Sequence, residues 1–237
     1  MTKTVIFDFG SSTSRIGSDE NETPKKFPTL VGRSTKPSDE PGMGPNDFYV
    51  GHHCYSRRAL YEDRNDFLCE CPIKNGMIEN WDQMEKLIDY SCKAVARKPE
   101  ESNFVMTEAV LNMRNKRSKM VENIFEKFNA PGLFFGSPAF FGLVAYGLME
   151  TSIVVDIGHE MIQVLPYSKE GERERKVGRL EYGGKDISEY YKHLLNGKGN
   201  QFKDTLEDSV LIDDLKQKSC YVAESFRKEM NKENGEV

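Results

Sequence analysis

Basic residues are not in excess in this 237-residue chain, which carries 33 Lys and Arg against 38 Asp and Glu and a formal net charge of −5. Proteins that bind nucleic acids or membrane surfaces through charge are usually basic. The sequence therefore argues against direct binding to nucleic acid or to a membrane. The glycine-rich loop GxxxxGK(S/T) is also absent, which excludes the phosphate-binding signature of one large class of nucleotide-binding proteins.

Cysteines are few, and their arrangement does not favour a metal site. The five cysteines form no CxxC pair. The Cys69-x-Cys71 pair beside two adjacent histidines matches no zinc-ligand spacing, so we interpret the cysteines as reduced thiols, buried or half-buried. The N-terminal MTKTVIFDFG lacks the apolar core of a signal peptide because Asp8 interrupts it, and this favours an intracellular protein.

A long uncharged run extends from Phe128 to Met149, enough to span a bilayer. Glycines and prolines interrupt the run, so a membrane-spanning helix is the weaker interpretation. Leu133–Phe135 is typical of a short strand. Ser137 is typical of a helix N-cap and Pro138 of the first helical position, while Gly147 is typical of a helix C-terminus. We therefore expect a strand, a tight turn and a buried helix.

Short β-rich segments alternate with amphipathic segments along the chain, which predicts an α/β fold. The other expected strands are Val5–Asp8, Arg15–Gly17, Phe27–Val31, Phe48–Gly51, Phe104–Thr107, Ser152–Asp156 and Met161–Pro166. The other expected helices begin at Asn80, with Gln83 as a capping-box partner, and cover Asn115–Phe128, Asp186–Leu195 and Asp208–Met230, the last of them broken. Exposed loops are expected at Ser34–Asn46 and Glu170–Lys176, and a fraying end from Lys228 to Val237.

Two segments far apart in the chain share one pattern. Val5–Gly10 (VIFDFG) and Ile153–Gly158 (IVVDIG) are apolar strands that end in Asp-x-Gly, and each precedes a second strand. Glycine at such a turn lets backbone N–H groups approach an anion, and Ser11 and Ser12 add hydroxyl donors. An Asp at the strand end suits a Mg²⁺ ion held through water. One such turn is most often only a turn, but the pair predicts a clamp around a metal–nucleotide. Gly183-Gly184, before a helix, is a further candidate for a close approach.

These motifs resemble those of the actin family. Asp8-Phe9-Gly10-Ser11-Ser12 is similar to the first phosphate loop of that family. Further similar segments follow in family order: Phe27–Arg33, Gly42–Gly44, Tyr49–Gly51, Pro72-Ile73, Gly76, Asn80–Lys86, Thr107–Ala109, Leu111-Asn112, Phe125–Pro131, Arg179–Asp186 and Lys218–Ala223. The resemblance is collinear from about residue 4 to residue 230.

The resemblance implies an α/β, actin-like ATPase (ribonuclease H-like) fold with two lobes flanking a nucleotide cleft, the second lobe incomplete. The implied divisions are a first-lobe core at 1–31 and 72–149, a small outer subdomain at 32–71, the start of a second lobe at 150–182 and a partial outer subdomain at 183–237. An actin would continue beyond this length, so we expect an exposed apolar patch that needs a partner. A truncated gene product is an alternative.

By the resemblance, the cofactors are ATP and Mg²⁺, both bound weakly. Asp8 and Asp156 are expected at the water shell of the metal. The residues expected at the nucleotide are Asp8, Gly10, Ser11, Ser12, Arg15, Asp156, Gly158, Gly184 and Lys216. Arg15 stands where the family has a lysine, which keeps the charge but not the compact geometry.

Residues that the family uses to position the attacking water differ in this chain. Pro138 and Gln163 stand at those positions, and a proline has no side-chain donor for a water. Glu160 in the second loop adds negative charge beside the phosphates. Gln217 and Asn75 are further departures. Positioning and charge stabilisation carry most of phosphoryl-transfer catalysis, so we expect little or no hydrolysis and assign no catalytic residue.

The expected function is a divergent actin-like structural or scaffold protein in cytoskeletal or chromatin-associated assemblies. Its expected partners are proteins, actin or actin-related proteins among them, and its expected location is the cytoplasm, with the nucleus as the alternative. The loop Lys36–Pro41 is acidic and proline-rich, and burying Asp39 and Glu40 unpaired is costly, so self-polymerisation is not expected. The alternatives are a polymerising actin-type ATPase, a sugar kinase and a non-nucleotide interaction fragment.

Overall fold

The structure is a computed structural model that describes residues 3–20, 22–37, 44–148, 150–168 and 177–230. The expected loop at Ser34–Asn46 and the polar end lie partly outside these residues, and the expected loop at Glu170–Lys176, like Asp39 and Glu40, lies outside them entirely. The chain divides into two compact units, Met1–Lys185 and Asp186–Val237. The predicted α/β content is confirmed within the first unit.

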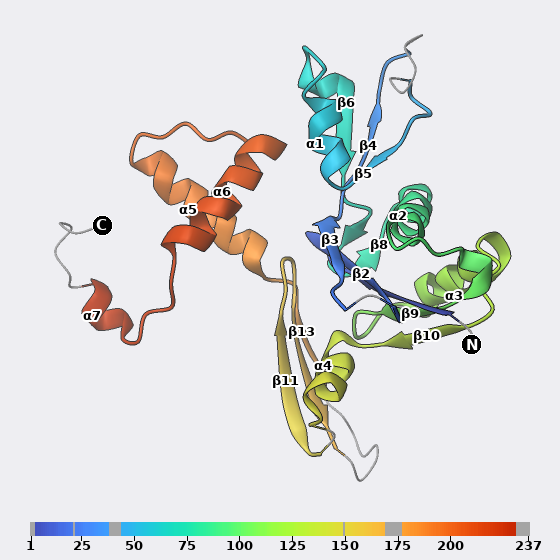
Figure 1. Cartoon of the computed structure of the whole chain (residues 1–237). Helices are drawn as coiled ribbons and strands as arrows, with labels where there is room; N and C mark the ends of the chain where they lie inside the picture. Colours follow the sequence, from blue (N-terminus) through green and yellow to red (C-terminus); the bar gives the residue numbers. More distant parts are fainter. Residues whose placement is uncertain (1–2, 21, 38–43, 149, 169–176, 231–237) are drawn as a thin grey trace. The chain divides into compact units, whose positions relative to one another are not determined.

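The largest sheet of the first unit has five strands (Figure 1). Its order is β10 (Leu133–Gly136), β9 (Ser102–Thr107), β1 (Lys3–Phe9), β2 (Thr13–Ser18) and β3 (Lys25–Pro28). β1 runs antiparallel to β2 and parallel to β9, and β9 runs parallel to β10. The carboxyl ends of three neighbouring strands therefore meet at one edge of this sheet.

One face of the five-stranded sheet packs into the main core. Val5 and Phe7 of β1 are fully buried with residues of α2 (Trp81–Ala94) and of α3 (Arg114–Glu122) and its π-helical continuation η3 (Asn123–Lys127). The buried helical residues in this core are Met84, Leu87, Ile88, Cys92, Met120 and Ile124. Met84, Leu87 and Ile88 are spaced three and four residues apart, so they lie on one buried face of α2.

The start of α2 follows the sequence prediction only in part. The Asn80 side chain accepts a hydrogen bond from the Gln83 N–H at 3.1 Å, which confirms the N-cap. The reciprocal bond of a capping box is not made, because the Asn80 N–H donates to Pro72 O at 3.3 Å and not to the Gln83 side chain. The Gln83 Nε2 donates to Glu70 Oε2 at 2.9 Å. The Gln83 side chain thus ties α2 to the end of β6 (Phe67–Glu70).

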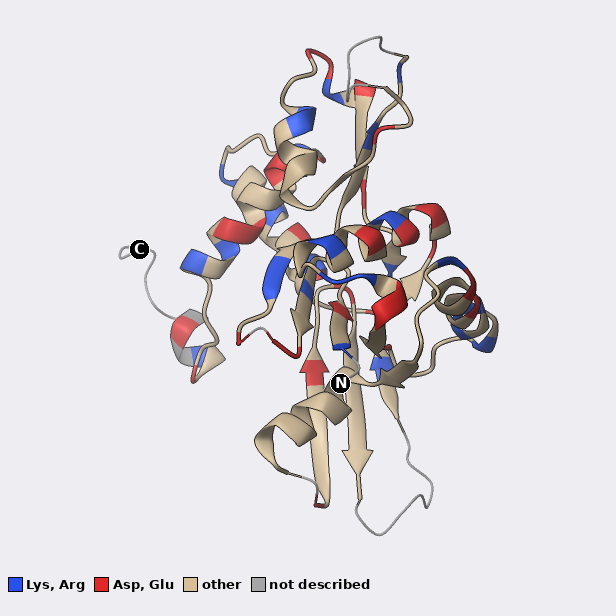
Figure 2. Ribbon diagram, turned by 45° about the vertical axis from the view of Figure 1, so that its right-hand side comes forward, with Lys and Arg blue, Asp and Glu red and all other residues tan. Residues whose placement is uncertain are grey.

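A second sheet consists of β11 (Ser152–Ile157), β12 (Ile162–Tyr167) and β13 (Gly178–Leu180), all antiparallel. The short helix α4 (Pro138–Tyr146) packs beside β11. These elements carry few charged residues (Figure 2). Ile153 and Ile157 are 72% and 70% exposed, whereas Val5, at the matching place in β1, is buried. One face of this sheet is therefore apolar and exposed.

The uncharged run before this sheet forms the predicted strand, turn and helix, but the prediction that the helix is buried is wrong, because only Ala139 and Leu143 of α4 are buried and Tyr146 is 82% exposed. Ser137 caps α4 by accepting a hydrogen bond from the Phe140 N–H at 3.1 Å, and Pro138 is the first helical residue. Gly147 ends the helix in the left-handed conformation, with φ at 67°. In the part of the chain that the structure describes, no helix is both long and apolar enough to cross a membrane.

A small outer sheet is built from β5 (Tyr49–Val50), β4 (Val31–Ser34) and β6. The predicted single strand Phe27–Val31 is wrong, because the Leu30 N–H donates to Pro28 O at 2.8 Å and this tight turn separates β3 from β4. The remaining short elements of the first unit are α1 (His52–Arg58), η1 (Arg64–Asp66), β7 (Ile73–Lys74), β8 (Met77–Ile78) and η2 (Pro99–Glu101).

The second unit is helical. α5 (Gly184–Gly197) begins at the end of the first unit, and α6 (Leu206–Ser219) and α7 (Phe226–Met230) follow. The predicted break between 208 and 230 is confirmed, because the chain leaves the helical conformation at Cys220. Within this unit Lys216 of α6 pairs with Asp213 at 3.0 Å and also donates to Ser188 of α5.

Candidate functional site

The two Asp-x-Gly hairpins have the same turn. In β1–β2 the Gly10 N–H donates to Thr13 O at 3.2 Å, and in β11–β12 the Gly158 N–H donates to Met161 O at 2.9 Å. A Cβ atom added at either glycine would lie 2.9 Å or 3.0 Å from the same acceptor oxygen. Both turns therefore need glycine because any side chain would crowd the bond that closes them.

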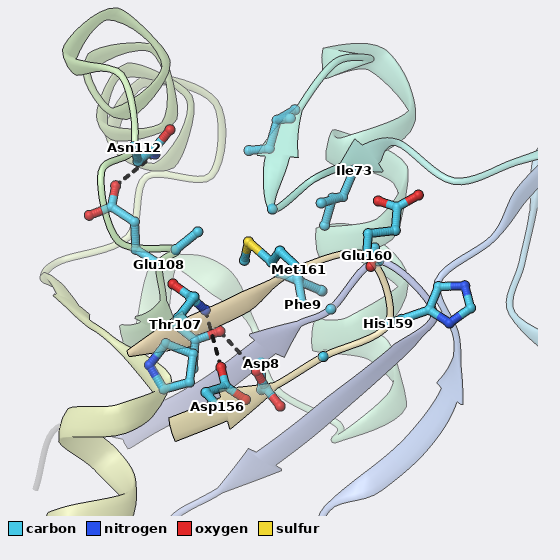
Figure 3. Close-up of a pocket in the computed structure, with 18 of the residues that line it drawn as sticks. Asp8, Phe9, Ile73, Thr107, Glu108, Asn112, Asp156, His159, Glu160 and Met161 are labelled. Atoms are coloured by element: carbon cyan, nitrogen blue, oxygen red, sulfur yellow. Dashed lines mark hydrogen bonds between the residues drawn. The ribbon is translucent and has the colours of Figure 1, made fainter. Parts of the chain in front are cut away.

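Both turns line one pocket with a volume of about 410 Å³ (Figure 3). The predicted site residues that line it are Asp8, Gly10, Ser11, Ser12, Arg15, Asp156 and Gly158. Gly184 is not among the lining residues. Its N–H donates to Gly158 O at 3.0 Å, so it stabilises the second turn through a backbone hydrogen bond. Lys216 is not among the lining residues either. It belongs to the second unit, where its Nζ pairs with Asp213 at 3.0 Å.

Asp8 is held by two partners from neighbouring strands. Arg15, directly opposite on β2, places Nη1 3.2 Å from Oδ2, and the Thr107 hydroxyl donates to Oδ1 at 2.9 Å. The Arg15 side chain is 51% exposed, so the ion pair contributes at most about 1 kcal/mol to stability. No role for Thr107 was predicted from sequence, although its place at the carboxyl end of a parallel strand is typical of site residues.

Asp156 has a neutral partner. Gln163, opposite it on β12 and only 2% exposed, donates from Nε2 to Asp156 Oδ2 at 3.1 Å and accepts from the Val110 N–H at 2.8 Å. Burial raises the pKa of Asp156 above its ordinary value, the bond from Gln163 opposes this, and the negative charge of Asp8 raises it further. A cation between the two carboxylates would relieve their repulsion.

Glu160 also lines the pocket, and its charge is balanced within the protein. Its side chain is 11% exposed, with Oε1 3.2 Å from Lys185 Nζ. Its Oε2 accepts from the Asn75 N–H at 2.7 Å. The Asn75 carbonyl in turn accepts from Arg179 at 2.6 Å. The negative charge expected beside the phosphates is therefore paired with a lysine, a pairing that was not predicted from sequence.

Three further residues that line the pocket had no predicted role: Glu108, Asn112 and Lys116. Asn112 donates from Nδ2 to Glu108 Oε1 at 2.9 Å, and Lys116 donates to Ile78 O at 2.6 Å. Pro138 lines the pocket as well. Glu108 and Asn112 follow β9 in the chain, and the family-like segments Thr107–Ala109 and Leu111-Asn112 were the only signal that marked them, whereas no signal marked Lys116.

The donor set of the pocket suits one kind of metal ion. Among the described residues, no group of three or more His, Cys, Asp or Glu side chains could hold a metal directly. Asp8 and Asp156 both line the pocket (Figure 3). Mg²⁺ prefers oxygen ligands, keeps several of its waters and needs only one or two carboxylates. The residues therefore fit a Mg²⁺ held through water and do not fit a cage of protein ligands.

A comparison with protein families gives one match for nearly the whole chain. The family model described as Actin matches residues 1–236. The matched range contains both hairpins and every residue that lines the pocket.

Proposed function

The chain belongs to the actin family, and on that premise we propose that its pocket binds the phosphates of Mg²⁺-ATP with little or no hydrolysis. One observation carries the proposal: two Asp-x-Gly turns, closed by the same hydrogen bond, border a single pocket. Glycine turns and serine hydroxyls are suited to phosphate groups, and two carboxylates are suited to a hydrated Mg²⁺.

We assign the roles by chemistry. Asp8 and Asp156 hold the water shell of Mg²⁺, which supplies positive charge to the phosphates when bound. Ser11 and Ser12 offer hydroxyl donors to the phosphate oxygens. Arg15 is half exposed, so its guanidinium can turn from Asp8 to a phosphate oxygen at little cost.

Weak hydrolysis is supported by the two residues that stand at the expected water positions. Pro138 offers no side-chain donor. Gln163 already uses its amide nitrogen on Asp156 and its amide oxygen on Val110. Neither residue is therefore arranged to orient an attacking water, and positioning is most of what this chemistry needs.

The cellular role and the partners of the protein are proposed from its family membership. We propose a structural or scaffold role in cytoskeletal assemblies, or alternatively in chromatin-associated ones, with proteins of the actin family as partners. In this proposal 1–31 and 72–149 form a first lobe, 32–71 its outer subdomain, 150–182 the start of a second lobe and 183–237 a partial outer subdomain. The separate sheets of the first unit support the first three divisions.

A binding assay and a phosphate-release assay test the proposal together. A fluorescent ATP analogue should bind the purified chain saturably with Mg²⁺ and more weakly with a chelator. Phosphate release from Mg²⁺-ATP should match the rate without protein. Absence of Mg²⁺-dependent binding would leave an interaction fragment, and sustained release would show an active ATPase.

A further inference from the structure

Two cysteines of the outer sheet lie against each other. Cys54 belongs to α1 and Cys69 to β6, and α1 packs on that strand. The Cys69 thiol lies 3.8 Å from the Cys54 carbonyl oxygen, to which it donates. Arg58, one turn further along α1, donates to Phe67 O at 2.6 Å and fixes the helix on the strand. The contact between the cysteines is therefore part of a packed interface between two elements.

The two thiols differ in their surroundings. Cys54 is fully buried, and its thiol also donates to Tyr49 O at 3.1 Å. A hydrogen bond with the Cys69 thiol, followed by burial, raises the pKa of Cys54 well above its ordinary value. Cys69 is only half-buried. An oxidant from solvent therefore reaches Cys69 first, with Cys54 held behind it as the second thiol.

We infer that Cys54 and Cys69 form a redox-active dithiol that a hydroperoxide converts into a disulfide joining α1 to β6. In the first step the Cys69 thiol loses its proton and the thiolate attacks one oxygen of hydrogen peroxide. The O–O bond breaks, the sulfur becomes a sulfenic acid, and the other oxygen leaves as hydroxide, which takes up the proton lost by Cys69 and becomes water. In the second step the Cys54 sulfur attacks the Cys69 sulfur, the S–O bond breaks, and the hydroxyl leaves with the Cys54 proton as a second water. Two thiols lose two electrons to one peroxide.

The other thiols of the first unit have different environments. Cys71 donates to the backbone oxygens of Ser11 and Ile73, both at 3.1 Å. Cys92 lies in the main core on α2. Burial raises the pKa of each to about 12, and neither residue belongs to α1 or β6, the two elements whose contact brings Cys54 and Cys69 together. They provide matched controls in the same chain.

The disulfide would close the segment that contains η1 and connects α1 to β6. Closing a loop of about 15 residues restricts the unfolded chain and stabilises the folded state when the native geometry is kept. The oxidised protein should therefore melt at a higher temperature than the reduced protein. This readout does not depend on nucleotide binding.

The test uses the full chain, treated with hydrogen peroxide and compared with a sample kept in dithiothreitol. Intact mass should fall by two hydrogen atoms, and non-reducing digestion should give one peptide pair joined through Cys54 and Cys69. Cys54→Ser and Cys69→Ser should each abolish the joined pair, and Cys71→Ser and Cys92→Ser should keep it. Cys69→Ser, at the half-buried position, decides the question even if Cys54→Ser fails to fold.

Three outcomes would overturn the inference. One is a Cys69 sulfinic acid beside an intact Cys54 thiol. Another is a disulfide that includes Cys71. The third is an unchanged melting temperature and no peptide pair joined through Cys54 and Cys69 while the exposed Cys220 is oxidised, since that would show that the reagent acted without joining the pair.

Discussion

Gln163 donates a hydrogen bond of 3.1 Å to Asp156, the residue directly opposite it on the neighbouring strand. In the other hairpin the residue opposite Asp8 is Arg15, a cation. The two hairpins therefore have the same turn but differ in charge. The Asp8 carboxylate faces a cation, and the Asp156 carboxylate faces a neutral amide. A cation such as Mg²⁺ would therefore gain more electrostatic stabilisation beside Asp156 than beside Asp8.

Removing Asp156 should weaken Mg²⁺-ATP binding. We expect Asp156→Ala to lower the affinity roughly 10–100-fold, the usual loss when a group that holds a metal's ligands is removed. Asp19→Ala is the control, because Asp19 is 43% exposed, pairs with Arg97 and does not line the pocket. Titration of a fluorescent ATP analogue measures both. Equal affinities for the two variants would contradict the proposed clamp.

The raised pKa of Asp156 should appear in the pH dependence of stability. The folded protein holds this proton to a higher pH than the unfolded chain, whose carboxyl has the ordinary value of 3.8. Stability therefore falls as pH rises from 3.8 to the raised folded pKa. Asp156→Asn has no such carboxyl group and does not lose this stability. The melting temperature of the variant minus that of wild type should therefore increase as pH rises through this range, and should stay constant at higher pH. A difference that does not vary with pH would contradict the prediction.

The first turn should not tolerate a side chain. In Gly10→Ala the new methyl group would lie 2.9 Å from the Thr13 backbone oxygen, which cannot move without opening the turn. We expect a loss of about 1–3 kcal/mol in unfolding free energy, together with weaker nucleotide binding. Gly17→Ala in the same hairpin meets nothing within 4 Å and should change neither. Urea unfolding and the binding titration give the two comparisons.

The pair Glu160–Lys185 should control the charge of the pocket. Lys185→Gln leaves the Glu160 carboxylate without its cation, so we expect nucleotide affinity to fall and the fall to shrink at high salt. Glu160→Gln together with Lys185→Gln should recover the affinity, giving a coupling between the two sites. If the two substitutions have additive effects on binding, Lys185 does not act through Glu160.

The cap of α2 gives a test that is independent of the nucleotide. Asn80→Ala removes the acceptor of the Gln83 N–H and should cost about 1 kcal/mol of unfolding free energy. Asn80→Ser keeps an oxygen acceptor and should stay close to wild type. Chemical unfolding followed by circular dichroism distinguishes the two, and equal losses would show that the cap itself contributes little.

The parts of the fold that were predictable from sequence depend on local chemistry. The α4 segment is an example, because Ser137, Pro138 and Gly147 each favour one backbone conformation without help from distant residues. The seven-residue helix α1 was not predicted, since Cys54 is its one buried residue and a single apolar position makes no periodic pattern. The three-residue β13 is similarly too short to show alternation.

The candidate site also has features that were predictable from sequence and features that were not. The Asp-x-Gly turns were visible because their chemistry lies within a few adjacent residues. The bond from Thr107 to Asp8 joins residues 99 positions apart, and the Lys185–Glu160 pair joins residues 25 positions apart. Both contacts depend on how strands and turns meet in space. The sequence alone therefore did not show that Asp8 accepts a hydrogen bond from Thr107 or that Glu160 forms an ion pair with Lys185.

The exposed apolar face of β11 has a consequence for handling the protein. In the described part of the chain β11 pairs on one side only, and Asp156 is the single charged residue within Ser152–Ile157. Charges on an open apolar strand discourage it from pairing with another molecule. We therefore expect Asp156, which alternates with the exposed Ile153 and Ile157 along β11, to discourage pairing at this edge. Neutral variants at this position then need low protein concentrations so that lost solubility is not taken for lost affinity.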